Sequence, residues 1–219
     1  MKKAYFITFE GPEGSGKSTQ IKLLKDFFSS KGYPVYTTRE PGGTYAGDKI
    51  RATLLDKACG NLEPETELFL MLAQRCENLR KVIKPAIENG TVVLCDRYFD
   101  SSMAYQGYAR GLDPKDIYEI HKSFLGDFLP DATILLQIEP ATGLQRANHN
   151  GKKQLDRIEL ESKSFHEKVY NGYNEMAAKE PDRFIKVEAI GTADEISQKI
   201  INSLYEKFPE LKNANKHFF

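Results

Sequence analysis

Gly11-Pro-Glu-Gly-Ser-Gly-Lys-Ser18 comes at the end of the apolar run Ala4-Tyr-Phe-Ile-Thr-Phe9. It matches G-x-x-x-x-G-K-[ST], the pattern of a loop that wraps nucleotide phosphates between a strand and a helix. Glycines let successive backbone N–H groups turn inward, Lys17 reaches the β- and γ-phosphates, and the Ser18 hydroxyl can ligate Mg²⁺. The alternative is an ordinary Gly-rich turn, but the flanking strand and helix favour a phosphate-binding loop.

The rest of the chain alternates between strand-like and helix-like runs, which predicts an α/β fold with a parallel sheet covered by helices on both faces. Nothing suggests a linker or a repeat, so we expect one domain over residues 1–219. The predicted strands are 4–10, 34–38, 91–95, 132–138 and 183–188. The predicted helices are 17–31, 64–88, 113–125, one from about 140, 159–179 and 192–207. We expect the tail, residues 209–219, to be loosely ordered.

The composition of the chain limits the kinds of partner that the protein can be expected to have. The 31 Lys and Arg residues balance 31 Asp and Glu residues, so the overall charge does not indicate a nucleic-acid partner or an acidic membrane. We find no run of 18 apolar residues and no signal-peptide core, and we expect no membrane. Cys59, Cys76 and Cys95 lie far apart in the sequence, which is typical of reduced packing thiols in a cytoplasmic protein.

A second cluster, Asp96-Arg-Tyr-Phe-Asp-Ser-Ser-Met-Ala-Tyr-Gln-Gly107, follows the predicted strand 91–95. Ligands of open α/β sheets bind outside the carboxyl ends of the strands, which would place Asp96 and Arg97 beside the glycine-rich loop. A carboxylate there can hold Mg²⁺, and an arginine can clamp a phosphate with two hydrogen bonds. The alternative is a helix-capping Asp with a surface Arg.

A third stretch, Thr38-Arg-Glu-Pro-Gly-Gly-Thr44, also follows a predicted strand. Arg39 before the Pro-Gly-Gly turn is placed to hold an anionic acceptor. Taken alone, the stretch fits a tight surface loop with a solvated arginine equally well.

Together the three stretches resemble the thymidylate kinase family in the order in which they occur, over nearly the whole chain. The most specific elements are Arg39-Glu-Pro-Gly-Gly-Thr44, Asp96-Arg-Tyr98 and Ala104-Tyr-Gln-Gly107, and Leu155-Asp-Arg-Ile-Glu159 resembles the end of the family's lid. The resemblance implies a three-layer P-loop NTPase fold, with a parallel five-stranded sheet and a mobile lid at about residues 146–158. It implies transfer of the γ-phosphoryl of ATP to dTMP, giving dTDP and ADP for DNA synthesis, by a cytoplasmic homodimer that uses Mg²⁺.

The resemblance also implies roles for individual residues. ATP would bind to the loop Gly11, Pro12, Glu13, Gly14, Ser15, Gly16, Lys17, Ser18 and Thr19, and Ser18 and Asp96 would hold the metal. Glu13 would meet the 3′-hydroxyl of dTMP, and Arg39 and Arg97 would grip its phosphate. Arg75 would donate to a thymine carbonyl, Ser102 and Gln106 would meet the other polar edge of the base, and Tyr105 would sit under the sugar. Without the resemblance, Arg75 reads as a solvated helix residue and Tyr105 as a core aromatic.

Met71 departs from the family pattern, which has an aromatic ring at this position, stacked on thymine. The thioether of Met71 can still lie against a ring. The residue therefore stays in the predicted acceptor site, with thymine bound more weakly or in a different pose.

The predicted lid is a second departure, because it is longer than usual and carries no arginine between Arg146 and Arg157. A cation from this segment is expected to neutralise the transferring phosphoryl group together with Lys17 and Arg97. The candidates are Arg146, Arg157, Lys152 and Lys153. The two lysines fit a solvated loop equally well.

Two other functions remain open at this stage. One is another phosphotransferase, either a kinase for a different nucleoside monophosphate or a deoxynucleoside kinase, which would need a carboxylate base near a 5′-hydroxyl. The other is a nucleotide-binding switch that transfers no phosphoryl group. The acceptor-type arginine stretches favour the monophosphate kinase.

Overall fold

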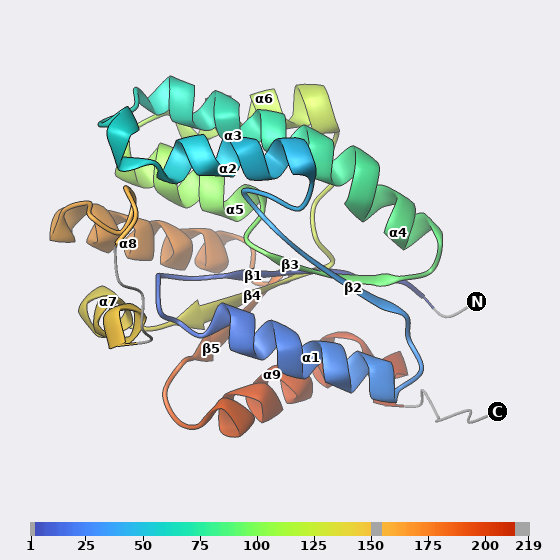
Figure 1. Cartoon of the computed structure of the whole chain (residues 1–219). Coiled ribbons are helices and arrows are strands. Elements are labelled where there is room, and N and C mark those ends of the chain that lie inside the picture. The colour runs from blue at the N-terminus through green and yellow to red at the C-terminus, as the bar shows by residue number, and fades with distance from the viewer. Residues whose placement is uncertain (1–2, 150–154, 213–219) are drawn as a thin grey trace.

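The computed structural model describes residues 3–149 and 155–212, without the side chains of 147–149. Five parallel strands form its centre (Figure 1), in the order β2-β3-β1-β4-β5. Their bounds are Phe6–Glu10 (β1), Val35–Arg39 (β2), Val92–Asp96 (β3), Ala132–Gln137 (β4) and Phe184–Glu188 (β5). The predicted parallel sheet with flanking helices is confirmed, and every predicted strand is present within two residues of its expected limits.

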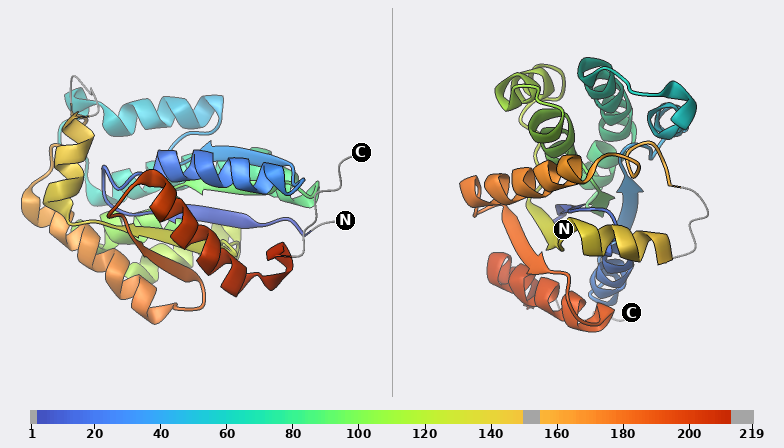
Figure 2. Two further views of the ribbon diagram at one scale, coloured as in Figure 1. Left: turned by 90° about the horizontal axis from the view of Figure 1, so that it is seen from below. Right: turned by 90° about the vertical axis from the view of Figure 1, so that its left-hand side faces the viewer.

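Helices cover both faces of the sheet, as Figures 1 and 2 show, and this makes the predicted three layers. On one face lie α1 and α9, and the larger set, which includes α3, α6 and α8, covers the other. The bounds of the described helices are Lys17–Ser30 (α1), Tyr45–Leu55 (α2), Pro64–Asn78 (α3), Lys84–Glu88 (α4), Phe99–Ser102 (α5), Pro114–Leu125 (α6), Pro140–His149 (α7), Lys163–Lys179 (α8) and Ala193–Lys207 (α9).

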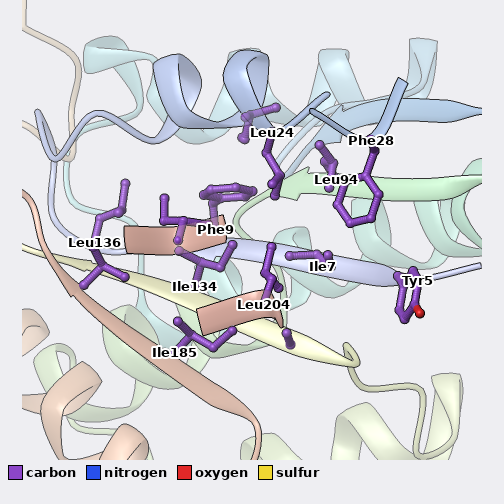
Figure 3. Close-up of a cluster of buried hydrophobic side chains, with 14 of the residues drawn as sticks. Tyr5, Ile7, Phe9, Leu24, Phe28, Leu94, Ile134, Leu136, Ile185 and Leu204 are labelled. Carbon is purple, nitrogen blue, oxygen red and sulfur yellow. The ribbon is translucent and has the colours of Figure 1, made fainter. Parts of the chain in front are cut away.

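The alternation of side chains along β1 explains how one strand supports both layers. Tyr5, Ile7 and Phe9 pack with α1 and α9 in the cluster drawn in Figure 3. Phe6 joins the opposite cluster beneath α3 and α6. Glu10, fully buried at the end of β1, shares the side of Phe6 by its spacing and therefore lies under the layer that carries the site.

Two helical segments near the site were not predicted. One is α2, and the other is the continuation of α5 into the π-helical segment Met103–Ala109. Both contain glycines or closely spaced polar residues, which mask a helical pattern in a short window. The predicted helix 64–88 is present as α3, the π-helical turn Leu79–Ile83 and α4, without an intervening loop.

The expectation of a loosely ordered tail is wrong for its first part. Pro209–Lys212 form a 3₁₀ turn, in which Leu211 is buried and Glu210 accepts a hydrogen bond from the Tyr5 hydroxyl (2.8 Å). The turn is stable because Leu211 joins the core beneath α1 and α9. Residues 213–219 lie outside the described part of the chain. Among the described helices, none is both long enough and apolar enough to cross a bilayer.

Candidate active site

The glycine-rich loop connects β1 to α1 at the carboxyl edge of the sheet, which the right-hand view of Figure 2 faces. Gly11 has a φ of 135°, and a β-carbon there would lie 2.4 Å from the Leu136 carbonyl oxygen, so only glycine fits. The Lys17 ammonium donates to the carbonyl oxygens of Gly11 (3.1 Å) and Pro12 (3.0 Å). Burial, and then the positive charge of Arg97, lower the pKa of Lys17. An anion bound in this loop would offset both effects.

The structure brings together Ser18 and Asp96, the two predicted metal ligands, beside the loop. The Ser18 hydroxyl donates to Asp96 Oδ2 at 3.4 Å, and β1 pairs with β3 so that Phe9 lies opposite Asp96. A hydroxyl and one carboxylate fit Mg²⁺, which takes one or two protein oxygens and completes its shell with phosphate oxygens and water. Within the described residues there is no group of three or more acidic, His or Cys side chains that would hold a metal without a nucleotide.

Arg97 has an unusual backbone, with a φ of 67° in the left-handed region. Its N–H donates to the Phe9 carbonyl oxygen (2.9 Å), which fixes the turn after β3. The guanidinium lies over the Tyr105 ring at 5.0 Å and donates to Glu13 Oε1 at 2.5 Å. A strained residue that the surrounding contacts hold in place is typical of a functional site.

Glu10 lies beneath Arg97 and organises its turn. It accepts hydrogen bonds from the Tyr98 N–H (2.8 Å), the Ser101 hydroxyl (2.7 Å) and the Tyr173 hydroxyl (2.7 Å). The same two hydroxyl oxygens accept from Arg97 Nη1, at 3.2 and 3.1 Å. Burial, together with the Asp100 carboxylate, raises the pKa of Glu10 to about 7.

Two further arginines lie at this edge. Arg39 is half exposed and pairs with Asp48 (3.3 Å), while Arg51 of α2 donates to the Pro41 carbonyl oxygen (2.9 Å). Burial, and then the charges of Arg39 and Arg97, lower the pKa of Arg51. Three guanidinium groups close enough to affect one another indicate a site for an anion.

The turn that carries Arg39 is built from glycines. Gly43 has a φ of 80°, and a β-carbon there would lie 2.4 Å from Thr38 Oγ1 and 2.5 Å from Asn78 Oδ1. The Gly42 N–H donates to Gln74 Oε1 (3.1 Å), so the turn is fixed to α3. The Glu40–Pro41 peptide bond is cis.

A cavity of about 530 Å³ joins these groups. Its described lining includes the predicted residues Glu13, Gly14, Gly16, Lys17, Ser18, Thr19, Arg39, Met71, Asp96, Arg97, Tyr105, Gln106 and Arg157. The structure therefore brings residues from three separate sequence stretches to one cavity. Arg75 and Ser102 are absent from that described lining.

Arg75 and Ser102 instead bond to each other at the buried side of α3. The fully buried Arg75 guanidinium pairs with Glu40 Oε2 (2.7 Å) and donates to Ser102 Oγ (3.0 Å) and the Tyr98 carbonyl oxygen (2.9 Å). Its remaining nitrogen, Nη1, is buried and has no hydrogen-bond partner within residues 3–149 and 155–212. The reading of Arg75 as a solvated residue is wrong, because it lies at the centre of a polar network.

The segment 155–162 closes one side of the cavity, and Arg157 attaches it to the body of the protein. Arg157 Nε donates to the Leu54 carbonyl oxygen (2.8 Å) and Nη2 to Glu67 Oε2 (2.5 Å). Arg110 pairs with both Glu67 (3.2 Å) and Glu161 (2.6 Å). Glu67 thus connects α3 to this segment from two directions.

Arg146 lies at a different cavity from Arg157. It belongs to α7, donates to the Ala189 carbonyl oxygen (2.9 Å) and lines a second cavity of about 440 Å³. Gly14, Gly16 and Thr19 line both cavities, so the loop separates them. The predicted lid therefore begins inside a helix, and Arg146 and Arg157 face different cavities. Lys152 and Lys153 lie outside the described residues.

Four residues of the site were not predicted: Glu10, Arg51, Glu67 and Arg110. Glu10 stands at the carboxyl end of β1, directly before the loop, where an acidic residue in an apolar run is a usable signal. Arg51 and Glu67 lie on helices and Arg110 just beyond one. Only tertiary contacts bring Arg51 and Glu67 to the cavity and Arg110 to Glu67.

Comparison with known proteins gives a consistent answer. Residues 9–200 match the family model described as thymidylate kinase. The chain is 44% identical over 211 residues to a thymidylate kinase of Desulfosudis oleivorans, covering 94% of this chain and 98% of that one. A thymidylate kinase of Desulforapulum autotrophicum is 46% identical over 204 residues, with 91% and 90% covered. The crystal structure of a thymidylate kinase from Ehrlichia chaffeensis superposes with a TM-score of 0.75 at 30% identity, covering 93% of this chain and all of that one.

Proposed function

The chain belongs to the thymidylate kinase family, and from this premise we propose that it transfers the γ-phosphoryl group of ATP to dTMP, giving dTDP and ADP. The observation that carries the proposal is the shared cavity. Lys17 of the phosphate-binding loop and the guanidinium groups of Arg39, Arg51 and Arg97 line one space at the carboxyl edge of the sheet. Two anionic nucleotides can approach each other only where cations offset their repulsion.

The acceptor chemistry requires little from the protein beyond positioning. A phosphate monoester has its second pKa near ~6, so dTMP presents a dianion at neutral pH and needs no general base. Arg39 and Arg97 would hold this phosphate in line with the γ-phosphoryl of ATP, and Glu13 and Tyr105 would contact the sugar. Lys17 would neutralise charge that develops on the transferring group.

Ser18 and Asp96 would hold Mg²⁺ together with the phosphates of ATP. When bound, the ion supplies charge neutralisation at the phosphate oxygens. The 3.4 Å contact between Ser18 Oγ and Asp96 Oδ2 supports this pairing, because both oxygens already face the same point beside the loop.

We assign the second cavity to the base of ATP. It opens on the far side of the loop, and its lining includes Arg146, Gly191 of the β5–α9 connection and Ala193 at the start of α9. We therefore assign Arg146 to the ATP base, and Arg157, which lines the acceptor cavity, to the lid cation that acts near the phosphoryl group.

We also propose a cytoplasmic homodimer that supplies the precursor of dTTP. The large apolar side chains of Phe69 on α3 and Phe124 on α6 are 59% and 63% exposed. The two helices are neighbours, since Arg80 Nη2 donates to the Phe124 carbonyl oxygen (3.0 Å) just beyond α3. A second copy that packed on these neighbouring helices would remove both apolar rings from water.

A substrate panel tests the proposal. Purified protein with ATP and magnesium is given dTMP, dUMP, dCMP, dGMP or thymidine, and ADP formation is measured by a coupled assay. We expect dTMP to be the best acceptor. Faster phosphorylation of thymidine than of dTMP would indicate a nucleoside kinase, and nucleotide binding without acceptor-dependent ADP would indicate a switch protein.

A further inference from the structure

We propose that Glu67 is the positioning residue that sets the base selectivity of the acceptor site. By holding the amide of Gln106 in one orientation, it makes the site complementary to the imide of thymine or uracil and not to cytosine. This inference rests on the proposed function and names the residue that controls one part of it.

The side chains around Gln106 lie in two facing rows, one on α3 and the other on α5 and the π-helical segment after it. Glu67, Met71 and Arg75 are four residues apart on α3 and therefore share one face of the helix. Ser102 and Gln106 face them from α5 and the π-helical segment after it. Two hydrogen bonds connect the rows, one helical turn on either side of Met71. Gln106 Nε2 donates to Glu67 Oε1 (2.7 Å), and Arg75 Nη2 donates to Ser102 Oγ (3.0 Å).

The charge state of Glu67 decides which way the amide faces. Burial alone would raise the pKa of Glu67, but hydrogen bonds from Arg157 and Gln106 and the charges of Arg110 and Arg157 outweigh it and lower that pKa. Glu67 is therefore ionised at neutral pH, and an ionised carboxylate only accepts hydrogen bonds. The amide of Gln106 must turn its NH₂ group toward Glu67.

The consequence is a buried, unpaired acceptor on a side chain that lines the cavity. Gln106 lines the cavity and is 4% exposed, and its Oε1 atom has no hydrogen-bond partner among the residues that the structure describes. On the other side of Met71, Arg75 Nη1 is an unpaired buried donor within the same described ranges. A buried polar atom without a partner is destabilising, and a ligand that supplies the partner recovers that cost.

This pattern distinguishes the pyrimidine bases. In thymine and uracil, N3 carries a hydrogen, which Gln106 Oε1 accepts, and O4 is a carbonyl. In cytosine, N3 is an acceptor and C4 carries an amino group, so the Gln106 oxygen would face a lone pair. A site built to accept an N–H rejects an analogue that lacks it, because its own polar group stays unpaired.

The test is Glu67→Gln, compared with wild type by kcat/KM for dTMP, dUMP and dCMP. A glutamine at this position can donate as well as accept, so the Gln106 amide is free to turn over. We expect the preference for dTMP over dCMP to fall by about tenfold or more, while the preference for dTMP over dUMP stays unchanged, because both bases carry the same imide.

The matched control is Glu161→Gln, which removes a carboxylate that also pairs with Arg110 but, among the described residues, makes no hydrogen bond with Gln106. It should leave the dTMP to dCMP ratio at the wild-type value. If Glu67→Gln does not fold, Glu67→Asp keeps the charge but shortens the side chain away from Gln106, and the same ratio is measured.

The outcomes separate the two proposals. Loss of rate toward all three acceptors with unchanged ratios would overturn this inference, since it would leave Glu67 a purely structural role through Arg157 and Arg110. Failure of the wild-type protein to phosphorylate dTMP would overturn the proposed function itself.

Discussion

Arg97 combines a strained backbone with a guanidinium group that lines the proposed acceptor site. Its left-handed backbone, with a φ of 67°, costs a non-glycine residue about 1–2 kcal/mol. The Arg97 guanidinium donates to the Ser101 and Tyr173 hydroxyl oxygens, which in turn donate to Glu10, and these bonds offset that cost. The sequence predicts that an arginine stands beside the loop. It does not predict the strain, because the strain depends on a carboxylate that is 87 positions away in the chain.

A pair of substitutions at this position separates strain from function. Arg97→Gly and Arg97→Ala both remove the phosphate clamp, so kcat/KM for dTMP should fall by about tenfold or more in each. Only glycine relieves the backbone, and the Gly variant should be more stable than the Ala variant by about 1 kcal/mol in urea unfolding. An Ala variant of equal or greater stability would show that the turn is unstrained.

His121 makes a second residue-scale prediction, about pH. It is 1% exposed, with its ring 4.4 Å from that of Phe99, and burial followed by the charge of Arg75 lowers its pKa to about 3. The unfolded chain binds a proton as the pH falls through about 6.5, whereas the folded state does not until about 3. The stability that neutral His121 contributes is therefore complete above pH 6.5 and is lost progressively below it.

His121→Leu removes this dependence. Between pH 7 and pH 5, wild type should lose about 2 kcal/mol more of its unfolding free energy than the variant. Urea unfolding at the two pH values measures both losses. Equal losses would mean that His121 takes up its proton over the same pH range in the folded and the unfolded protein. Its pKa would then not be lowered by folding.

At the scale of elements, the sheet was predictable and the helices around the site were less so. Runs such as Val92–Asp96 are apolar and short, with charged residues directly after them, so both the strands and their carboxyl edge follow from the sequence. By contrast, the π-helical segment Met103–Ala109 places Tyr105 and Gln106 through packing against α3 and α8. No local pattern specifies a π-helix, because its stability comes from those contacts.

The two arginines at either end of the predicted lid have different partners, and this gives an element-scale prediction. Arg146 of α7 lines the cavity assigned to the base of ATP, so Arg146→Ala should raise KM for ATP about tenfold with little change in KM for dTMP. Arg157 lines the acceptor cavity, so Arg157→Ala should lower kcat about tenfold or more. Steady-state kinetics with each substrate varied measures both.

A lower kcat in Arg146→Ala together with a higher KM for ATP in Arg157→Ala would reverse these assignments. If neither variant lowers kcat by about tenfold, the lid cation must come from residues outside the described part of the chain, where Lys152 and Lys153 are the remaining candidates. Replacing both lysines by Met, which keeps the length of the aliphatic chain, then tests that possibility directly.

For the whole molecule, the homodimer proposed above can be tested at the surface of α3 and α6, where Phe69 and Phe124 are exposed. Phe124→Asp on α6 places a charge in the proposed interface and should give a monomer by light scattering. Ile190→Asp is the control, because Ile190 is equally exposed (64%) but lies in the β5–α9 connection, away from α3 and α6. A wild-type monomer, or a Phe124→Asp dimer, would contradict this choice of interface.

The central claim is that ATP and dTMP meet phosphate to phosphate at the carboxyl edge of the sheet. The most direct measurement is transfer of label from ATP carrying ³²P in its γ-phosphoryl group, with the products separated by chromatography. We expect dTDP labelled in its β-phosphoryl group, formed only when dTMP and magnesium are both present, and no labelled dTDP from Lys17→Ala. Label that appears only in inorganic phosphate, or on the 5′-oxygen of thymidine in preference to dTMP, would contradict it.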